Sequence, residues 1–191
     1  MIRIGSMFTG YGGLDLAVAA HYGGSVVWHA EIERAAIGLL EKRWPDVPNL
    51  GDVANINWSE VPAVDIITGG FPCQDVSHAG FGRGLRPGTR SGLWEYMAYA
   101  IDMLRPQRVI IENVKGLLSS GAHSDMEPCS WCLGDIGGQP ALRALGSVLG
   151  TLADIGYDAQ WSSVRASDAG APHIRSRIFI VARTAADAGS R

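Results

Sequence analysis

The sequence predicts a doubly wound α/β fold, in which helices cover both faces of a mostly parallel sheet. Short apolar segments alternate with helical segments along the chain, as they do in βαβ units. Glycine or polar residues follow several of the apolar segments, where the strands of such a sheet end. The composition, 47% hydrophobic and 18% charged, is that of a globular chain, and 191 residues suit a single domain.

Each element follows from its local sequence. Strands are expected where apolar and β-branched residues run together, at Ile2–Phe8, Ser25–Ala30, Val64–Thr68, Arg108–Glu112, Trp161–Ala166 and Arg177–Ala182. Helices are expected at Leu14–His21, Glu33–Arg43, Leu93–Leu104 and Ala141–Ile155. Pro45 and Pro106 end the second and third helices, and Gly156 is the expected C-cap of the fourth. The remaining long segments, Asp75–Gly92 and Ser119–Gln139, are expected to be functional or mobile loops.

Composition excludes several classes of protein. No apolar run approaches the roughly 20 residues that cross a bilayer, so no membrane partner is expected. The first residues lack the features of a secretory signal, and three cysteines, an odd number, argue against a disulfide framework. A cytoplasmic protein is therefore expected. With 16 Lys+Arg against 19 Asp+Glu, the net charge of −3 taken alone disfavours a nucleic-acid partner.

A glycine turn at Phe8–Asp15 follows the first predicted strand, where the backbone can approach a ligand closely. Glu31 ends the second predicted strand, where a carboxylate can bind ribose hydroxyls, and Asp52 can accept a hydrogen bond from an adenine amino group. Asp15 stands where a dinucleotide-binding turn has its third glycine, and its charge would repel a pyrophosphate. The pattern favours a nucleoside cofactor without phosphates, such as S-adenosylmethionine. A plain tight turn would explain the glycines equally well.

Three further segments carry reactive groups. Cys73 follows a predicted strand end and Pro72, and its thiolate would be a strong nucleophile, although most lone cysteines are structural. Glu112 ends another strand at the same sheet edge and could act as a general acid or cap the next turn. Arg175 and Arg177 alternate in an extended segment and so can point together, to bind phosphate or to lower the pKa of a thiol. They could also be a solvated strand entrance.

The order of these segments resembles that of the C5-cytosine DNA methyltransferases of bacteria and phages. The resemblance covers Phe8 to about Val181. Its elements are FxGxGG at Phe8–Gly13, the acidic Glu31, Asp52, PCQxxSxxG at Pro72–Gly80, SGL at Ser91–Leu93, ENV at Glu112–Val114 and RxR at Arg175–Arg177. Any one of them could arise by chance, whereas the ordered set is specific. It implies one catalytic domain over residues 1–191, with the Rossmann-like fold of S-adenosylmethionine-dependent methyltransferases.

The resemblance implies methyl transfer from S-adenosylmethionine to C5 of cytosine in double-stranded DNA, with the base flipped out of the helix. Cys73 would add to C6, Glu112 would protonate or hydrogen-bond N3, and Arg175 and Arg177 would lie against the target nucleotide. The cofactor would be held by Phe8, Gly10, Gly12, Leu14, Glu31, Asp52, Val53, Pro72 and Leu93. DNA would be contacted by Gln74, Ser77, Arg83, Arg86 and Arg90. These arginines reconcile a negative net charge with a DNA partner.

Three features depart from the family pattern. His173 stands where the family's QxRxR begins with Gln, and no target-recognition domain or final cofactor-site motif follows before Arg191. Cys129 and Cys132 form half a zinc site, with His123 nearby, but a surface loop without metal is expected. The alternatives left open are a catalytic subunit of a restriction–modification system with a second subunit for recognition, a remnant with little activity that binds DNA or cofactor, and an RNA cytosine methylase.

Overall fold

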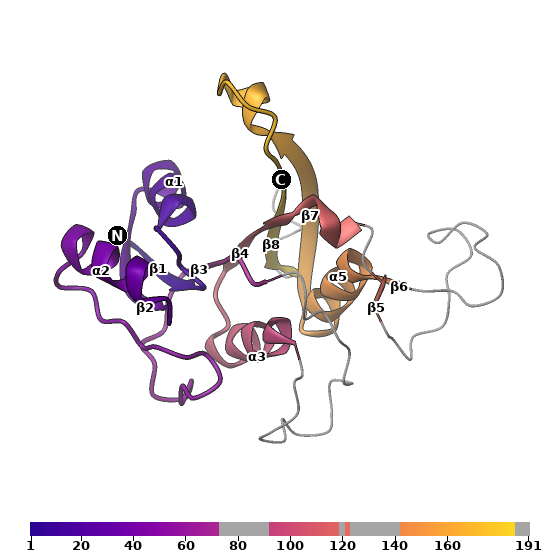
Figure 1. The fold of residues 1–191 in the computed structure, drawn as a ribbon. Helices are drawn as coiled ribbons and strands as arrows, with labels where there is room; N and C mark the ends of the chain where they lie inside the picture. The colour runs from indigo at the N-terminus through magenta and orange to yellow at the C-terminus, as the bar shows by residue number, and fades with distance from the viewer. Residues whose placement is uncertain (73–91, 119–120, 123–141, 186–191) are drawn as a thin grey trace, which may run out of the picture.

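The structure, a computed structural model, describes residues 1–72, 92–118, 121–122 and 142–185. In these residues six strands form one sheet, in the order β2-β1-β3-β4-β8-β7 (Figure 1). The strands are β1 (Ile2–Met7), β2 (Gly24–Ala30), β3 (Ile66–Gly69), β4 (Arg108–Val114), β7 (Tyr157–Arg165) and β8 (Ser176–Thr184). Neighbours from β2 to β4 pair in parallel, whereas β8 is antiparallel to both β4 and β7.

Helices pack on both faces of the sheet, as Figure 1 shows for α1 on one side and α3 and α5 on the other. The helices are α1 (Gly13–Tyr22), α2 (Arg34–Arg43), α3 (Leu93–Leu104) and α5 (Ala144–Asp154), with short 3₁₀ turns η2 (Lys115–Leu118) and η3 (Ala166–Ala169). The apolar cluster beneath α1 consists of Ile4, Val18, Val26, Ile66 and Ile110. The larger cluster beneath α3 and α5 includes Met97, Ile101, Ile111, Val148, Leu152 and Ile180. The predicted doubly wound, mostly parallel sheet is confirmed.

The order of the strands reverses between β1 and β3. The chain passes from β1 to β2 on one side and then returns to build β3 and β4 on the other side. Crossover connections leave this reversal point in opposite directions, which opens a crevice outside the carboxyl ends of β1 and β3. The strand order alone therefore predicts a ligand site at this crevice.

Two predicted boundaries were wrong. The last predicted helix starts at Ala144 instead of Ala141, because β6 (Leu142–Arg143) pairs with β5 (Gly121–Ala122). The predicted strand Trp161–Ala166 is instead β7, which starts four residues earlier at Tyr157 and ends at Arg165. Its second half is exposed and is held by backbone pairing with β8. The apolar pattern of β6 or of β7 does not reveal these boundaries, because each strand is held by a partner from another part of the chain.

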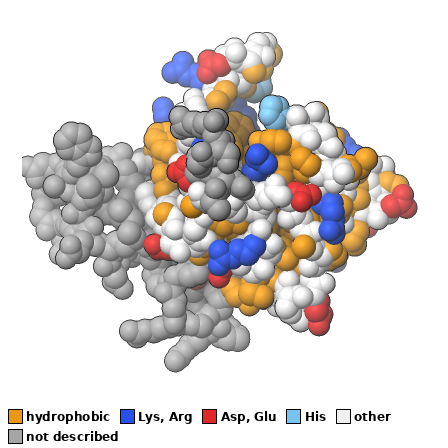
Figure 2. All heavy atoms as spheres, turned by 180° about the vertical axis from the view of Figure 1, so that it is seen from behind, with side chains coloured by type: hydrophobic (Ala, Val, Ile, Leu, Met, Phe, Trp, Pro, Cys, Tyr) orange, Lys and Arg blue, Asp and Glu red, His pale blue; other side chains and the backbone are white. Residues whose placement is uncertain are grey.

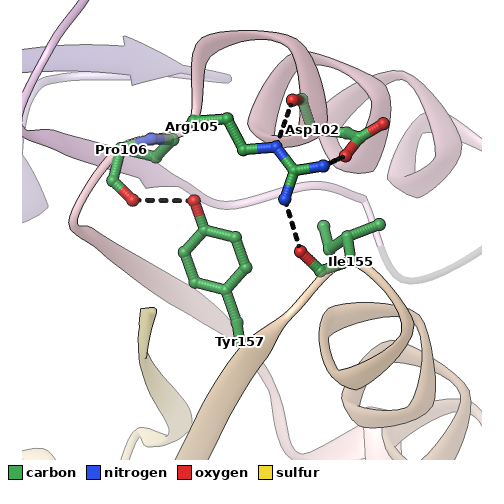
Figure 3. Close-up of polar contacts among 5 residues, drawn as sticks. All are labelled: Asp102, Arg105, Pro106, Ile155 and Tyr157. Atoms are coloured by element: carbon green, nitrogen blue, oxygen red, sulfur yellow. Dashed lines mark hydrogen bonds and ion pairs between the residues drawn. The ribbon is translucent and has the colours of Figure 1, made fainter. Parts of the chain in front are cut away.

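A polar joint connects the end of α3 to the start of β7 (Figure 3). Arg105 takes a left-handed backbone conformation, with φ 47°, forms an ion pair with Asp102 and donates from Nη1 to the carbonyl of Ile155 (2.8 Å). The Tyr157 hydroxyl donates to the carbonyl of Pro106 (2.7 Å), and burial raises the pKa of this phenol to about 12. These contacts tie the segment before β4 to the segment that leads into β7.

Buried polar side chains cross the sheet beneath α1. Ser6 on β1 lies between His29 on β2 and Thr68 on β3, and all three are at most 1% exposed. The His29 ring lies 5.2 Å from the Trp44 ring, and neither of its nitrogens has a hydrogen-bond partner among the described residues. Burial therefore lowers the pKa of His29 from 6.5. The folded protein keeps this imidazole neutral.

We expect His29 to make the fold sensitive to acid. Below about pH 6.5 the unfolded chain binds a proton at His29 that the folded chain resists, so stability is present above that pH and is lost as the pH falls. His29→Phe keeps a ring against Trp44 and cannot be protonated. In urea titrations between about pH 7.5 and 5.5, this variant should lose less free energy of unfolding than the wild type. The exposed His21→Gln is the control, and a His29→Phe variant that matches its pH dependence would contradict the expectation.

Candidate cofactor and catalytic site

A pocket of about 270 Å³ opens at the carboxyl ends of β1, β2 and β3, at the crevice where the strand order reverses. Six residues predicted for the cofactor line it: Phe8, Glu31, Asp52, Val53, Pro72 and Leu93. Sequence reasoning missed four others: Ala30, Ile32, Gly51 and Gly70. Each of the four lies one or two positions from a predicted residue, so adjacency to the motifs was the available signal.

The glycine turn between β1 and α1 forms one wall of the site. Gly10 (φ 54°) and Gly12 (φ 73°) take left-handed conformations, which explains the glycines, and Phe8 does so as well with φ 52°. Gly10 and Gly12 do not line the pocket; they turn the chain so that Phe8 does. Leu14 packs into the apolar cluster beneath α1 and also lies outside the lining. These three residues shape the wall instead of forming its surface.

Glu31 is the electrostatic centre of the pocket. Its Oε2 accepts a hydrogen bond from the Gly10 N–H (2.7 Å), and its Oε1 accepts from the N–H groups of Ile32 and Glu33 (both 2.8 Å). The Asn49 side chain, which sequence reasoning missed, pairs with both backbone polar groups of Glu31 (3.0 Å each). A carboxylate offers about four acceptor positions, so about one is left at Oε2 for a ligand hydroxyl.

Asp52 lines the pocket from the segment that follows the Asn49 contact. Its Oδ1 accepts from the Ala54 N–H (3.0 Å), and its backbone carbonyl accepts from Asn55 N–H (2.9 Å). This Asx turn holds the carboxylate in place while it stays partly exposed. Val53 is 5% exposed and supplies apolar surface next to it.

The second part of the site lies on β4. Glu112 Oε1 is 2.7 Å from Arg177 Nε, and both side chains remain partly exposed. The register explains this pair, because Arg177 lies opposite Val114, two residues from Glu112 on the same face of the sheet. Asn113 faces the other way, is 3% exposed, and donates from Nδ2 to the Phe71 carbonyl (2.9 Å). Its Oδ1 accepts from the Val114 N–H (2.8 Å), so Asn113 and not Glu112 caps the end of the strand.

Gly70 joins the two parts. It lines the pocket, and a Cβ placed on it would lie 3.4 Å from Glu112 Oε2. The carboxylate of Glu112 therefore lies directly behind one wall of the pocket, separated from it by a residue without a side chain.

The model of the C-5 cytosine-specific DNA methylases matches residues 2–187 of this chain. The chain belongs to this family. Type II methyltransferase M.NlaIV of Neisseria lactamica is 34% identical over 154 residues, and Type II methyltransferase M1.ScrFI of Lactococcus lactis subsp. cremoris is 32% identical over 175 residues. These alignments cover 81% and 92% of this chain but only 33% and 40% of the two relatives. The expectation of a second subunit gains no support from the comparisons.

Solved structures show the same fold. A putative DNA modification methyltransferase encoded within an E. coli prophage superposes with a TM-score of 0.68 at 24% identity, and the S. pombe Dnmt2 methyltransferase with 0.70 at 17% identity. Each comparison covers 97% of this chain, and 47% and 51% of the respective structures. The predicted Rossmann-like methyltransferase fold is confirmed.

The methylase motifs that carry the predicted nucleophile and DNA contacts lie outside the described residues. The residues concerned are Cys73, Gln74, Ser77, Arg83, Arg86 and Arg90. The residues of the half zinc site, His123, Cys129 and Cys132, also lie outside the described residues. Within the described ranges, no group of three or more His, Cys, Asp or Glu is placed to hold a metal ion. No helix in that part of the chain is long and apolar enough to cross a membrane.

The two arginines of the RxR motif have different environments. Arg177 is paired with Glu112, whereas Arg175 is exposed in the connection between β7 and β8, where its carbonyl accepts from the Ala166 N–H (2.8 Å). Arg175 comes directly before the first residue of β8, Ser176, so that the two arginines lie on either side of the strand's start, and their common direction stays a prediction. On the face shown in Figure 2, acidic and basic side chains of the described residues are interspersed.

The expectation that Asp15 faces the cofactor was wrong. Asp15 is 1% exposed, accepts a hydrogen bond from the Thr68 hydroxyl, and does not line the pocket. It lies on the side of the first turn of α1 that faces the sheet. Burial raises the pKa of this carboxyl, while its hydrogen bonds with Thr68 and Ser6 lower it. Asp15 belongs to the buried polar cluster beneath α1, together with Ser6 on β1 and Thr68 on β3.

We expect the charge of Asp15 to reduce stability. A carboxyl whose pKa is raised on folding contributes most stability below the unfolded value of 3.8 and loses it as the pH rises through the folded value. Asp15→Asn keeps an acceptor for Thr68 without the charge, so it should equal or exceed the wild type in urea denaturation at neutral pH. Asp15→Ala removes the acceptor and should cost about 1–3 kcal/mol. If Asp15→Asn proves as unstable as Asp15→Ala, the buried charge is itself required.

Proposed function

We propose that this chain transfers a methyl group from S-adenosylmethionine to C5 of cytosine in double-stranded DNA, as the catalytic domain of a modification methylase. The observation that carries the proposal is the position of Gly70, between a nucleoside-sized pocket and the Glu112 carboxylate. A cofactor in the pocket and a base against Glu112 would lie on either side of this residue. Family membership and the Type II names of the relatives support DNA as the substrate.

The pocket fits a nucleoside without phosphates. Phe8, Val53, Pro72 and Leu93 provide apolar walls for a base, and Glu31 has acceptor capacity for a ribose hydroxyl. Two amides of the glycine turn already have acceptors: Gly10 donates to Glu31, and Gly12 donates to the Thr9 carbonyl (2.9 Å). None of the described lining residues is Lys or Arg. The preference for a cofactor without phosphates thus depends on Glu31 and not on Asp15, because the charge of Glu31 disfavours an anion at the turn.

In the proposed reaction, Cys73 and Glu112 activate a flipped cytosine together. The Cys73 thiolate forms a bond to C6, the C5–C6 π electrons form a C4–C5 double bond, and the C4–N3 π electrons move to N3, to which Glu112 donates a proton or hydrogen bond. S-adenosylmethionine held by pocket residues such as Phe8, Glu31 and Asp52 would supply the electrophilic methyl group that C5 accepts and would leave as the thioether. A base then removes the C5 proton, the C6–S bond breaks, and the thiolate is restored.

The described residues support this chemistry by fixing positions. Arg177 holds Oε1 of Glu112, whereas Oε2, on the side of Gly70, has no hydrogen bond or ion pair among the described residues. Asn113 holds the Phe71 carbonyl, two residues before Cys73, and so ties the chain that leads into the nucleophile to the strand that carries Glu112. Asn113 is therefore a positioning residue. Arg175, which is exposed on the β7–β8 connection, would contact the DNA backbone.

Covalent trapping tests the function. The chain is incubated with S-adenosylmethionine and with heterogeneous duplex DNA that contains 5-fluorocytosine, whose fluorine blocks release of the C6 adduct. The wild type and the control Cys132→Ser should form a complex that survives denaturing electrophoresis. Cys73→Ser should form none, and Glu112→Gln should form it about 100-fold more slowly.

The outcomes separate the alternatives. Trapping by Cys73→Ser would refute the assigned nucleophile. Trapping on 5-fluorocytosine RNA but not on DNA would support an RNA methylase. Cofactor binding in calorimetry without trapping on either would support a remnant, and absence of both would overturn the proposal.

Gly70→Ala should separate cofactor binding from turnover. Among the described residues, the new methyl group would contact only Glu112 atoms, at 3.4 Å, and Gly70 has no left-handed backbone that would forbid alanine. We expect the folded chain to bind S-adenosylmethionine with unchanged affinity, but to methylate DNA about 10- to 100-fold more slowly, because the methyl group crowds the carboxylate. Steady-state kinetics and calorimetry measure the two effects. A variant with wild-type turnover would show that Oε2 of Glu112 is not used on this side.

A further inference from the structure

The glycine turn has a second set of contacts besides those to Glu31, and they come from the C-terminal end of α2. Arg43 Nη1 donates to the carbonyl of Tyr11 (2.7 Å). The indole of Trp44 lies beneath Gly12, where a Cβ would approach its ring atoms to 2.6 Å. The Arg43 guanidinium lies 5.5 Å from the centre of the same indole ring. Two adjacent residues thus contact two adjacent residues of the turn.

The turn depends on contacts of this kind. Phe8, Gly10 and Gly12 all take left-handed backbone conformations within five positions, and Gly12 caps α1 without a side-chain hydrogen bond. A segment rich in glycine samples many other conformations when nothing holds it. Arg43 binds the turn at a carbonyl, and Trp44 supports it at a point where only glycine fits.

Trp44 is itself well anchored. Its N–H donates to the Leu40 carbonyl (2.7 Å) at the end of α2, and its ring lies 5.2 Å from that of buried His29 on β2. It also packs against the apolar cluster beneath α1. Arg43, by contrast, is exposed, so its main described contacts are the hydrogen bond to the turn and the stacking on Trp44.

We propose that Arg43 and Trp44 are positioning residues that hold the glycine turn in its ligand-binding conformation and thereby set the affinity for the cofactor. Neither residue lines the pocket, so they act through Phe8 and the Gly10–Glu31 hydrogen bond. A wall that is already in place before binding avoids the entropic cost of ordering it on binding. The identity of the cofactor rests on the proposed function, whereas the effect on the turn does not.

Arg43→Gln and Lys42→Gln form a matched pair for the test. Both remove one positive charge from the exposed last turn of α2, but only Arg43 binds the turn. Hydrogen–deuterium exchange of the cofactor-free chain should be several-fold faster in peptides covering residues 8–16 of Arg43→Gln, with unchanged exchange elsewhere and an unchanged melting temperature. Lys42→Gln should match the wild type.

Calorimetry with S-adenosylmethionine then measures the consequence. Arg43→Gln should bind about tenfold more weakly, since a charge-assisted hydrogen bond is lost, and Arg43→Lys should recover part of the affinity. Trp44→Phe should bind more tightly than Trp44→Leu, because it keeps a ring beneath Gly12.

Unchanged exchange at residues 8–16 in Arg43→Gln would overturn the proposal, and so would faster exchange with unchanged affinity. If the wild type itself does not bind S-adenosylmethionine, the proposed function fails. The exchange comparison still decides whether Arg43 holds the turn.

Discussion

Three backbone N–H groups converge on the carboxylate of Glu31, one from the glycine turn after β1 and two from the segment that leads into α2. The side chain is 9% exposed, so its charge needs these donors, and the donors need an acceptor. The contact joins the first two βα units at the crevice where ligands bind. It also consumes the amide of Gly10, which a phosphate would otherwise use. The geometry of the pocket wall and the negative charge beside the turn follow from the same interaction.

The antiparallel strand β8 explains the composition of the catalytic edge. β1 to β4 all end at this edge, so they can contribute only their last residues and the turns that follow. β8 runs in the opposite direction and begins there, which places Arg177 beside Glu112 near the end of β4. A parallel strand in the position of β8 would begin at the opposite edge of the sheet, so its first residues could not lie beside Glu112. The reversal of one strand therefore supplies a cation to an edge otherwise rich in carboxylates and glycines.

The sequence allowed prediction of those features that depend only on strand ends. Glu31 and Glu112 could be predicted at one place because the carboxyl ends of parallel strands meet at one edge, whatever the details of packing. The direction of Asp15 could not, since it depends on the rotation of α1 over the sheet, and its interior position became visible only with Thr68 beneath it. Asn49 and Gly70 act through partners 18 and 42 residues away, for which no local pattern exists. The ion pair of Arg177 with Glu112 could not be predicted either, since it depends on the antiparallel register of β8 with β4.

The site divides into two groups of residues that meet at one point. Glu31, the glycine turn and the end of α2 shape the pocket, and none of them contacts Glu112 among the described residues. Glu112, Arg177 and Asn113 form the second group, which reaches the pocket only through Gly70 and Phe71. Cofactor affinity and the positioning of the carboxylate are thus carried by different contacts. The glycine at their junction leaves no side chain between the pocket and the Glu112 carboxylate, because a Cβ there would stand 3.4 Å from Oε2.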